Sequence, residues 1–320
     1  MSKTSKSAEP FVIAVDWGTT SFRLWLVDQE GGVLGQSASN EGMTTAQKSG
    51  FAAILERHLA SISAPPDCPV LMCGMVGARQ GWCEAPYIQA PANLTVLAAN
   101  AIRLDGPRDC RILPGVAQTT AFDVMRGEET QLLGLTTANM ITGQNLVCIP
   151  GTHAKWVTLN QQELTGFTTY MTGELFAVLG RHSVLQHSLD MIHQIEADDP
   201  NFQAGLDQSM TGQSALTSRL FTIRAGSLLG NVSNAANAAK LSGLLIGDEI
   251  KDACQRLIGR DQVSAARKPR VTLVAAGGLT SLYRRALTRF GADVEEIDAE
   301  AAARQGLLHA ARQIWGQQTS

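Results

Sequence analysis

Apolar and polar residues alternate in the same way at two places in the chain. Near the N-terminus, the segment 11–28, FVIAVDWGTTSFRLWLVD, reads as an apolar strand, a Gly-Thr-Thr turn and a second alternating strand. The segment 146–160, LVCIPGTHAKWVTLN, repeats that order. Runs with a period of two around a short polar turn are typical of β-hairpins. The sequence therefore predicts two corresponding hairpins in two halves of the chain.

A third strand is expected after each hairpin, at 33–37 and at 162–169. In the first half, apolar residues at helical spacing predict a helix over 46–62, and a short apolar run predicts a strand over 70–73. Three strands, a helix and a further strand favour a mixed sheet within an α/β fold.

The second half contains a strand and several longer helical patterns. Polar residues make 198–212 a predicted loop. Four helices are expected: from Thr172 to about Ile195, over 235–257, from Ser281 onward, and over 299–315. A buried strand is expected over 271–275. The crossover near Gly143 predicts two domains, 1–143 and 144–320, as expected for 320 residues.

Composition excludes several classes of protein. Lys and Arg total 26 and Asp and Glu total 29, a net charge of −3, so neither nucleic acid nor an anionic membrane is an expected partner. The polar start MSKTSKSAEP is not a signal peptide, and no apolar run is long enough to span a bilayer. The six cysteines form no CxxC pair, which favours free thiols in the cytoplasm. A homodimer is left open.

The first turn has the chemistry of a phosphate site. Asp16 ends the entering strand, and Gly18, Thr19 and Thr20 follow it. Backbone N–H groups and hydroxyls of such a turn can hold phosphate oxygens, and a neighbouring carboxylate can hold a hydrated Mg²⁺. The alternative is an ordinary hairpin with a surface acid.

The second turn resembles the first but lacks its acid. Gly151 and Thr152 can hold phosphate oxygens, while Pro150 stands where the first turn has Asp16. Lys155 is either a phosphate contact or an exposed strand residue, and His153 is more typical of a structural turn residue. Further on, Gly277 and Gly278 separate a strand from a helix, an arrangement that lets a ligand approach the backbone.

Two further stretches carry polar chemistry. The segment 74–87, GMVGARQGWCEAPY, has no helix or strand period and contains Arg79, Gln80, Trp82, Glu84 and Tyr87. An arginine fork and aromatic walls are typical of a pocket for a small acid; the alternative is that Trp82 and Tyr87 close the edge of a core.

The segment 119–137 places three acids, Asp123, Glu128 and Glu129, among apolar residues. These acids form either the solvent face of a helix or a source of the general base.

Three motifs, DWGTT, PGTHAKW and AAGGL, stand in the order of the phosphate-1, phosphate-2 and adenosine motifs of the actin/heat-shock/sugar-kinase ATPase superfamily. Together with GMVGARQGWCEAPY, DVMRGEETQLLG and MTGELF, they resemble the 2-dehydro-3-deoxygalactonokinase family over essentially the whole chain after residue 10. The resemblance implies two RNase H-like domains with mixed sheets and ATP in the cleft between them. It also implies transfer of the ATP γ-phosphoryl group to the C6 hydroxyl of 2-dehydro-3-deoxy-D-galactonate.

Roles for the candidate residues follow from this chemistry. Asp16 would hold the Mg²⁺ shell, the two turns the phosphates, and Gly277 and Gly278 the adenosine. Arg79, or Arg23 as second choice, would bind the sugar carboxylate, and Asp123 or Glu129 would act as base. An exopolyphosphatase-like hydrolase and a non-catalytic, actin-like nucleotide sensor are the alternatives.

Overall fold

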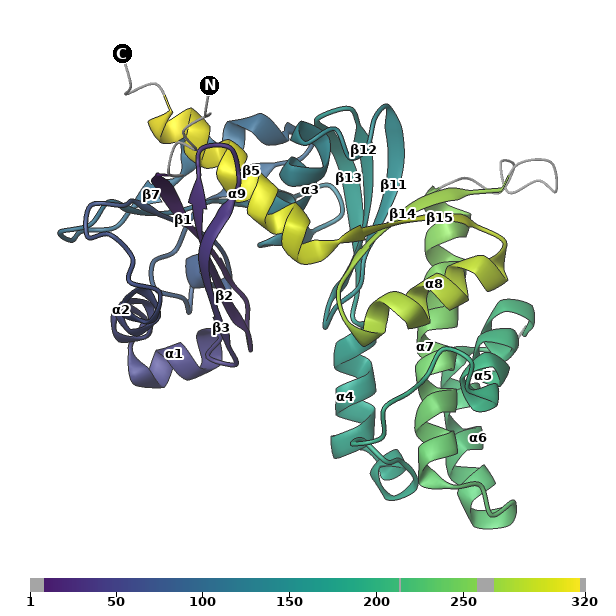
Figure 1. The fold of residues 1–320 in the computed structure, drawn as a ribbon. Coiled ribbons are helices and arrows are strands. Elements are labelled where there is room, and N and C mark those ends of the chain that lie inside the picture. Colours follow the sequence, from purple (N-terminus) through teal and green to yellow (C-terminus); the bar gives the residue numbers. More distant parts are fainter. Residues whose placement is uncertain (1–8, 213, 258–267, 317–320) are drawn as a thin grey trace, which may run out of the picture. The chain divides into compact units, whose positions relative to one another are not determined.

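The computed structural model describes residues 9–212, 214–257 and 268–316. The chain divides into two compact units (Figure 1). Unit 1 comprises residues 1–143, 159–166 and 299–320, and unit 2 comprises residues 144–158 and 167–298. The C-terminal helix therefore belongs to unit 1, whereas the sequence assigned all of 144–320 to one domain.

The main sheet of unit 1 is mixed. Its order is β3-β2-β1-β4-β8-β7, with β1, β2 and β3 antiparallel and with β4 and β8 parallel to β1. Its strands are β1 (Pro10–Trp17), β2 (Phe22–Asp28), β3 (Val33–Ser39), β4 (Val70–Gly74), β7 (Ile102–Arg103) and β8 (Cys110–Ile112). The predicted hairpin and third strand are present in the described residues.

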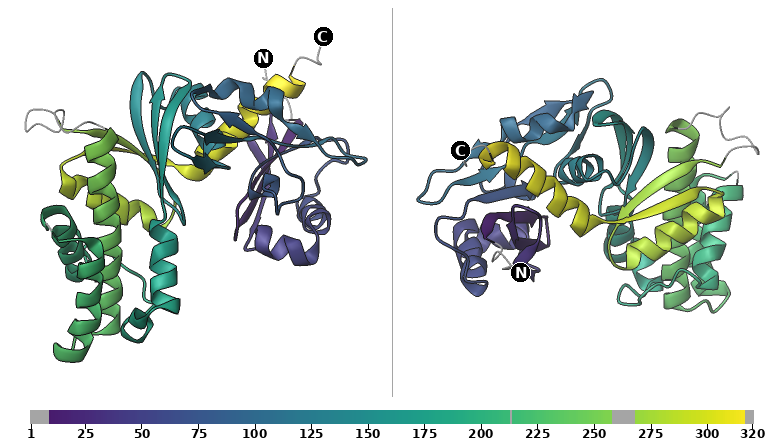
Figure 2. Two further views of the ribbon diagram at one scale, coloured as in Figure 1. Left: turned by 180° about the vertical axis from the view of Figure 1, so that it is seen from behind. Right: turned by 45° about the horizontal axis from the view of Figure 1, so that its top comes forward.

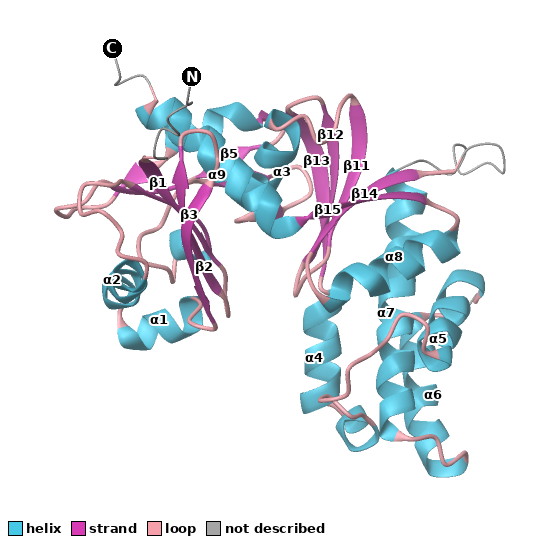
Figure 3. Ribbon diagram, viewed as in Figure 1, coloured by secondary structure: helices cyan, strands magenta, loops and turns pink. Residues whose placement is uncertain are grey.

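Two helices, α1 (Met43–Ser49) and α2 (Phe51–Ser61), cover one face of this sheet (Figure 3). The sequence predicted one helix over 46–62; the chain instead breaks at Gly50, whose φ is 87°. Ile54, Leu55 and Leu59 of α2 are buried against the strands, which is what the apolar spacing predicted.

Unit 1 also contains α3 (Glu128–Thr137) and α9 (Ala299–Trp315). These helices pack closely, because a Cβ on Gly134 of α3 would lie only 2.0 Å from the carbonyl oxygen of Ala302. The C-terminal helix is therefore part of the core of unit 1. A smaller sheet of order β10-β9-β5 contains β5 (Tyr87–Gln89), β9 (Gly115–Gln118) and β10 (Asp123–Met125). Further short elements are β6 (Ala92–Asn93) and a 3-10 helix (Leu94–Asn100).

Unit 2 repeats the strand order of unit 1. Neighbouring strands run β15-β14-β11-β12-β13, with β14 parallel to both β11 and β15. The strands are β11 (Gln144–Ile149), β12 (Ala154–Asn160), β13 (Glu163–Tyr170), β14 (Arg270–Ala275) and β15 (Asp293–Asp298). The end of β12 and the first half of β13 fall within 159–166, which belongs to unit 1. The hairpin predicted from the repeated pattern is therefore formed by β11 and β12.

Unit 2 contains more helices than the sequence predicted. Figure 2 shows the ribbon from behind. They are α4 (Thr172–His182), α5 (Pro200–Thr211), α6 (Leu216–Leu229), α7 (Asn234–Leu257) and α8 (Gly278–Phe290), with a 3-10 helix at Val184–Ser188. The helix predicted to reach about residue 195 ends at His182. The loop predicted over 198–212 is wrong, because Asp199 caps α5, and Phe202 and Leu206 bury its inner face.

The described cysteines are free thiols, five of them buried and Cys83 exposed. Among the helices of the described ranges, none combines the length and the apolarity that crossing a bilayer requires.

Candidate active site

In unit 1, β1 brings Asp16 to the predicted phosphate turn. The N–H of Gly18 donates to the carbonyl of Ser21 at 2.9 Å and closes the turn, leaving Thr19 and Thr20 exposed. The Asp16 side chain is 19% exposed. The turn is therefore accessible, and it carries a carboxylate and two hydroxyls. A site for an anion with its bound cation needs such groups.

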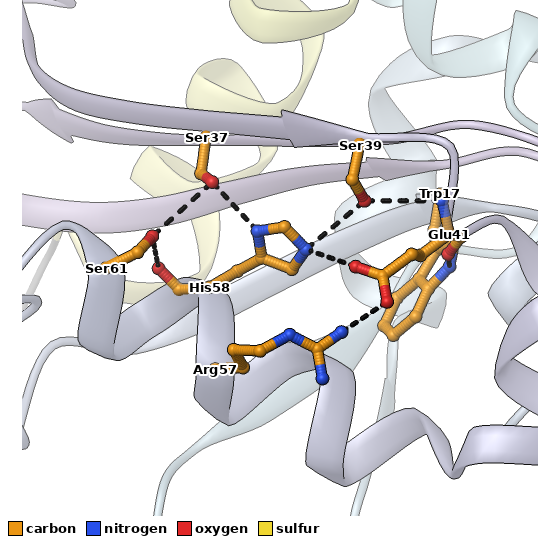
Figure 4. Close-up of polar contacts among 7 residues, drawn as sticks. All are labelled: Trp17, Ser37, Ser39, Glu41, Arg57, His58 and Ser61. Carbon is orange, nitrogen blue, oxygen red and sulfur yellow. Dashed lines mark hydrogen bonds and ion pairs between the residues drawn. The ribbon is translucent and has the colours of Figure 1, made fainter.

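A polar network holds Trp17, which lies between Asp16 and the turn (Figure 4). The carbonyl of Glu41 accepts the indole N–H of Trp17 at 3.0 Å, and the Glu41 carboxylate contacts Arg57 and the ring Nε2 of His58. The His58 ring is buried, with its Nδ1 2.8 Å from the hydroxyl of Ser37. The segment after β3 is thereby held against the residue that follows Asp16.

The same segment bonds directly to the turn. The N–H groups of Met43 and Thr44 donate to the carbonyls of Gly18 and Thr19, at 2.9 and 3.2 Å. Two carbonyls of the turn are thus satisfied by the start of α1, which reduces the freedom of the turn.

Glycines bring the start of α3 close to Asp16. A Cβ on Gly74 would lie 2.6 Å from the carbonyl oxygen of Trp17, and a Cβ on Gly127 would lie 3.2 Å from the Cα of Gly74. Only glycine permits these backbone approaches. Glu128 and Glu129 therefore start α3 near the end of β1.

The acids in this region repel one another and are partly desolvated. Burial raises the pKa of Asp16 to about 6; Arg23 opposes this shift, and Glu128 and Glu300 add to it. Burial also raises the pKa of Glu129 to about 7, again with a contribution from Glu128. Carboxyls with raised pKa values are typical of sites that bind cations or protons.

The three candidate acids have different surroundings. Glu129 is fully buried, and both of its carboxylate oxygens accept the N–H of Gly127 at 2.8 Å. Asp123 lies on another element, β10, where it accepts the N–H of Val124 at 2.8 Å. Glu128 is partly exposed and influences both Asp16 and Glu129. The sequence analysis named Glu128 as one of the acids but did not select it; its position at the start of α3, where the helix dipole favours an acid, is the signal.

Arg23 is an ion-pair partner of acids in the same unit. Its Nε lies 2.8 Å from Glu300, and its Nη1 lies 3.8 Å from Asp16. These contacts reduce its availability for a sugar carboxylate, the role given to it as second choice.

The segment 74–87 of unit 1 has one anchored side and one exposed side. The Trp82 ring stacks on the ring of Phe51, with the two ring centroids 6.1 Å apart. Trp82 also packs against the core, as the core-edge alternative predicted. The guanidinium carbon of Arg126 lies 4.3 Å from the centroid of the Tyr87 ring. Tyr87 nevertheless remains 38% exposed.

On the exposed side of this segment, Arg79 is 81% exposed, with its Nε 3.5 Å from Glu84. The carbonyl of Gln80 accepts from the side chain of Gln47, on α1, at 3.0 Å. Arg79 is therefore accessible to a ligand, and its described partner is another predicted substrate residue.

In unit 2 the corresponding turn has no acid. The N–H of Glu174 donates to the carbonyl of Thr152 at 3.0 Å, and the Glu174 carboxylate contacts the ring of His153. Lys155 is buried, and its ammonium donates to the carbonyl of His153 at 3.0 Å. The alternative that Lys155 is an exposed strand residue is therefore wrong, and its positive charge lies within the turn.

A cavity of about 460 Å³ opens beside this turn within unit 2. Its lining includes Gly151, Thr152, Thr172, Gly173, Gly278 and Tyr283. Cβ atoms built on Gly277 and Gly278 would meet no other atom within 4 Å, so this backbone is open to a ligand. Gly277 itself has a φ of 64° and precedes the first turn of α8. The second turn and the Gly-Gly junction thus border one cavity.

Comparison with known proteins identifies the family. The sequence model of the 2-keto-3-deoxy-galactonokinase family matches residues 16–310, which covers both units. The chain belongs to that family.

Two curated relatives support this assignment. A candidate 2-dehydro-3-deoxygalactonokinase of Rhizobium meliloti strain 1021 is 48% identical over 95% of this chain and 98% of its own length. The 2-dehydro-3-deoxygalactonokinase of Escherichia coli strain K12 is 34% identical over 94% of this chain and 98% of its own length. The chain is therefore a carbohydrate kinase, and a kinase of this family uses ATP. The exopolyphosphatase and sensor alternatives are not favoured.

Solved structures agree with the fold. A crystal structure of a candidate 2-dehydro-3-deoxygalactonokinase from Sinorhizobium meliloti has a TM-score of 0.89 and 46% identity, over 97% of this chain and 99% of that one. An activator of a 2-hydroxyisocaproyl-CoA dehydratase from Clostridium difficile has a TM-score of 0.51 and 14% identity, over 96% of this chain and 97% of that one. The chain therefore shares its fold with both solved structures, and the predicted α/β class with mixed sheets is confirmed.

Proposed function

We propose that this enzyme transfers the γ-phosphoryl group of ATP to the C6 hydroxyl of 2-dehydro-3-deoxy-D-galactonate, forming the 6-phosphate and ADP in galactonate catabolism. The observation that carries this proposal is the match to the family across residues 16–310. The bond between the γ-phosphorus and the β–γ bridging oxygen breaks while the O6–phosphorus bond forms, and the C6 hydroxyl loses its proton.

The chain's residues fit a magnesium ion shared with the nucleotide. Within the described part of the chain, no cluster of three or more His, Cys, Asp or Glu side chains could hold a metal alone. Mg²⁺ in kinases is commonly held by one or two carboxylates together with substrate phosphates and water. Asp16, partly exposed and with a pKa raised by burial, is the proposed ligand. The ion, when bound, would neutralise charge on the phosphates.

The nucleotide is proposed to use both turns. The backbone and hydroxyls of Gly18, Thr19 and Thr20 would contact phosphate oxygens from unit 1. Gly151, Thr152 and the buried charge of Lys155 would do so from unit 2, with Gly277 and Gly278 beside the adenosine. The cavity next to Gly151 and Gly278 supports this proposal. Binding of ATP in an interdomain cleft remains a prediction.

The acceptor is proposed to bind to the 74–87 segment. Arg79 offers an exposed guanidinium for the carboxylate, with Arg23 as second choice. Other proposed contacts are Gln80, Trp82, Glu84 and Tyr87. For the general base we favour Glu128 over Glu129, because Glu128 is partly exposed and Glu129 is buried. We favour it over Asp123, because Glu128 starts α3 near the end of β1, whereas Asp123 lies on β10.

The test is a panel of 3-deoxy-2-keto sugar acids, assayed for ADP formation with ATP, with and without Mg²⁺. ADP formation that requires 2-dehydro-3-deoxy-D-galactonate and Mg²⁺ is expected. Phosphate release without any sugar acid would indicate a phosphohydrolase, and binding of ATP without turnover on any acid would indicate a sensor. Location in the cytoplasm and assembly into a homodimer remain predictions.

A further inference from the structure

One buried acid of unit 2 lies outside the two turns and has no part in the proposed chemistry. Glu249, on α7, is only 3% exposed. It occupies an apolar stripe of the helix, between the buried residues Ile246 and Ile250. Burying an ionised carboxylate is costly unless hydrogen bonds compensate for the lost water. The contacts of Glu249 therefore require an explanation.

Three donors converge on this carboxylate. Its Oε1 accepts the indole N–H of Trp156 at 2.8 Å, and its Oε2 accepts the hydroxyl of Tyr283 at 2.7 Å and also that of Thr172. Burial raises the pKa of Glu249, and all three donors act in the opposite direction. An ionised carboxylate can only accept hydrogen bonds, so three donors suit its charged form.

The three donors come from separate elements, two of which border one cavity. Trp156 lies on β12, directly after the turn that contains Gly151 and Thr152. Thr172 starts α4 and Tyr283 lies on α8, and both line the cavity. α7, which carries Glu249, contacts both α4 and α8 and is the long green helix in Figure 1.

The hydrogen bond from Thr172 to Glu249 also restrains the turn that contains Gly151 and Thr152. A Cβ on Gly173, the next residue, would lie 2.5 Å from the carbonyl oxygen of Gly151, so α4 packs directly on the turn. The N–H of Glu174 donates to the carbonyl of Thr152. A displacement of Thr172 would therefore be transmitted to Gly151 and Thr152.

We propose that Glu249 is a positioning residue of the nucleotide subsite, which fixes β12, α4 and α8 around the cavity beside Gly151. Apolar packing in place of a buried charged group is often neutral or stabilising, and in some proteins buried polar groups specify one arrangement. The identity of the ligand as ATP rests on the proposed function.

The test measures the affinity of a non-hydrolysable ATP analogue by calorimetry. Glu249→Gln keeps the size of the side chain but loses the charge, and the Kd should rise about tenfold, which is about 1.4 kcal/mol. In assays, the KM for ATP should rise similarly while kcat changes less than about twofold, a split that a general loss of stability would not produce.

The matched control is Asp252→Asn. Asp252 lies one turn further along α7 and also accepts a tyrosine hydroxyl, that of Tyr170 at 2.8 Å, but it does not line the cavity. Its variant should bind the analogue as the wild type does. Equal losses in the two variants, or an unchanged Kd for Glu249→Gln, would overturn the proposal.

Two further arms complete the test. If Glu249→Gln does not fold, Tyr283→Phe removes one donor and should still weaken analogue binding, and an unchanged Kd would again refute the proposal. If the wild type binds the analogue but phosphorylates no sugar acid, the proposed function fails while this inference stands. A wild type that binds no analogue would overturn both.

Discussion

The two hairpin turns share a backbone pattern but differ in their electrostatics. In unit 1, Asp16 has a raised pKa and lies near further acids. In unit 2, the turn contains a buried cation, Lys155, and a cavity opens beside it. A similar strand-turn-strand motif thus presents an acid in one copy and a positive charge in the other.

Asp16 of unit 1 and Glu249 of unit 2 differ in their polar contacts. Glu249 of unit 2 accepts hydrogen bonds from three side chains. The described polar contacts of Asp16 are longer, 3.9 Å to the Sγ of Cys73 and 3.8 Å to Arg23. An acid that is saturated with donors holds structure in place, whereas one with weak partners remains available for a cation.

The largest expected effect tests the acid of unit 1. Asp16→Asn removes the proposed magnesium ligand and should reduce kcat by about 10³-fold. An ATP-coupled assay measures it, with circular dichroism as the check of folding. Asp28→Asn is the matched control, since Asp28 is a buried acid on the neighbouring strand whose side chain only accepts the N–H of Gly32. Near-normal turnover of Asp16→Asn would contradict the assignment.

The second prediction concerns the general base. Glu128→Gln should lower kcat by about 10²-fold with a smaller change in the sugar-acid KM, because proton transfer occurs in the transition state. Asp123→Asn should remain within about twofold of the wild type, since Asp123 lies on β10 and not at the start of α3. Steady-state kinetics separate the two variants, and the reverse ranking would make Asp123 the base.

A third prediction concerns stability and pH in the absence of ligands. The pKa of Glu129 rises from 4.5 to about 7 on folding, so the native state binds the proton more tightly than the unfolded state. The resulting stabilisation is complete below about pH 4.5 and is lost as the pH rises through about 7, amounting to about 3 kcal/mol. Urea titrations should show a shallower decline for Glu129→Gln, and parallel declines would refute this account.

The smallest effect concerns the acceptor. Arg79→Ala should raise the sugar-acid KM about tenfold, the loss expected for a charged hydrogen-bond partner, and leave the ATP KM unchanged. Arg103→Ala is the control, because Arg103 is an exposed arginine of the same unit that also pairs with an acid. Equal shifts in both KM values would show that Arg79 does not bind the carboxylate.

Local patterns in the sequence predicted much of the fold. The period-two runs predicted both hairpins, and the Ala-rich composition of 299–315 predicted α9 with its observed bounds. The loop predicted over 198–212 conflicts with a short-range signal. Asp199-Pro200 is a helix start, with a capping acid followed by proline at the first helical position.

The sequence by itself determined the two turns, their residues and their family, because a hairpin and its turn are encoded by neighbouring residues. Only the tertiary structure decided which acids lie close together. Glu128 reaches the vicinity of Asp16 because Gly74 and Gly127 allow close backbone contact, and Glu249 meets its donors across long separations in sequence. Charge, burial and hydrogen bonding depend on residues that only folding brings together.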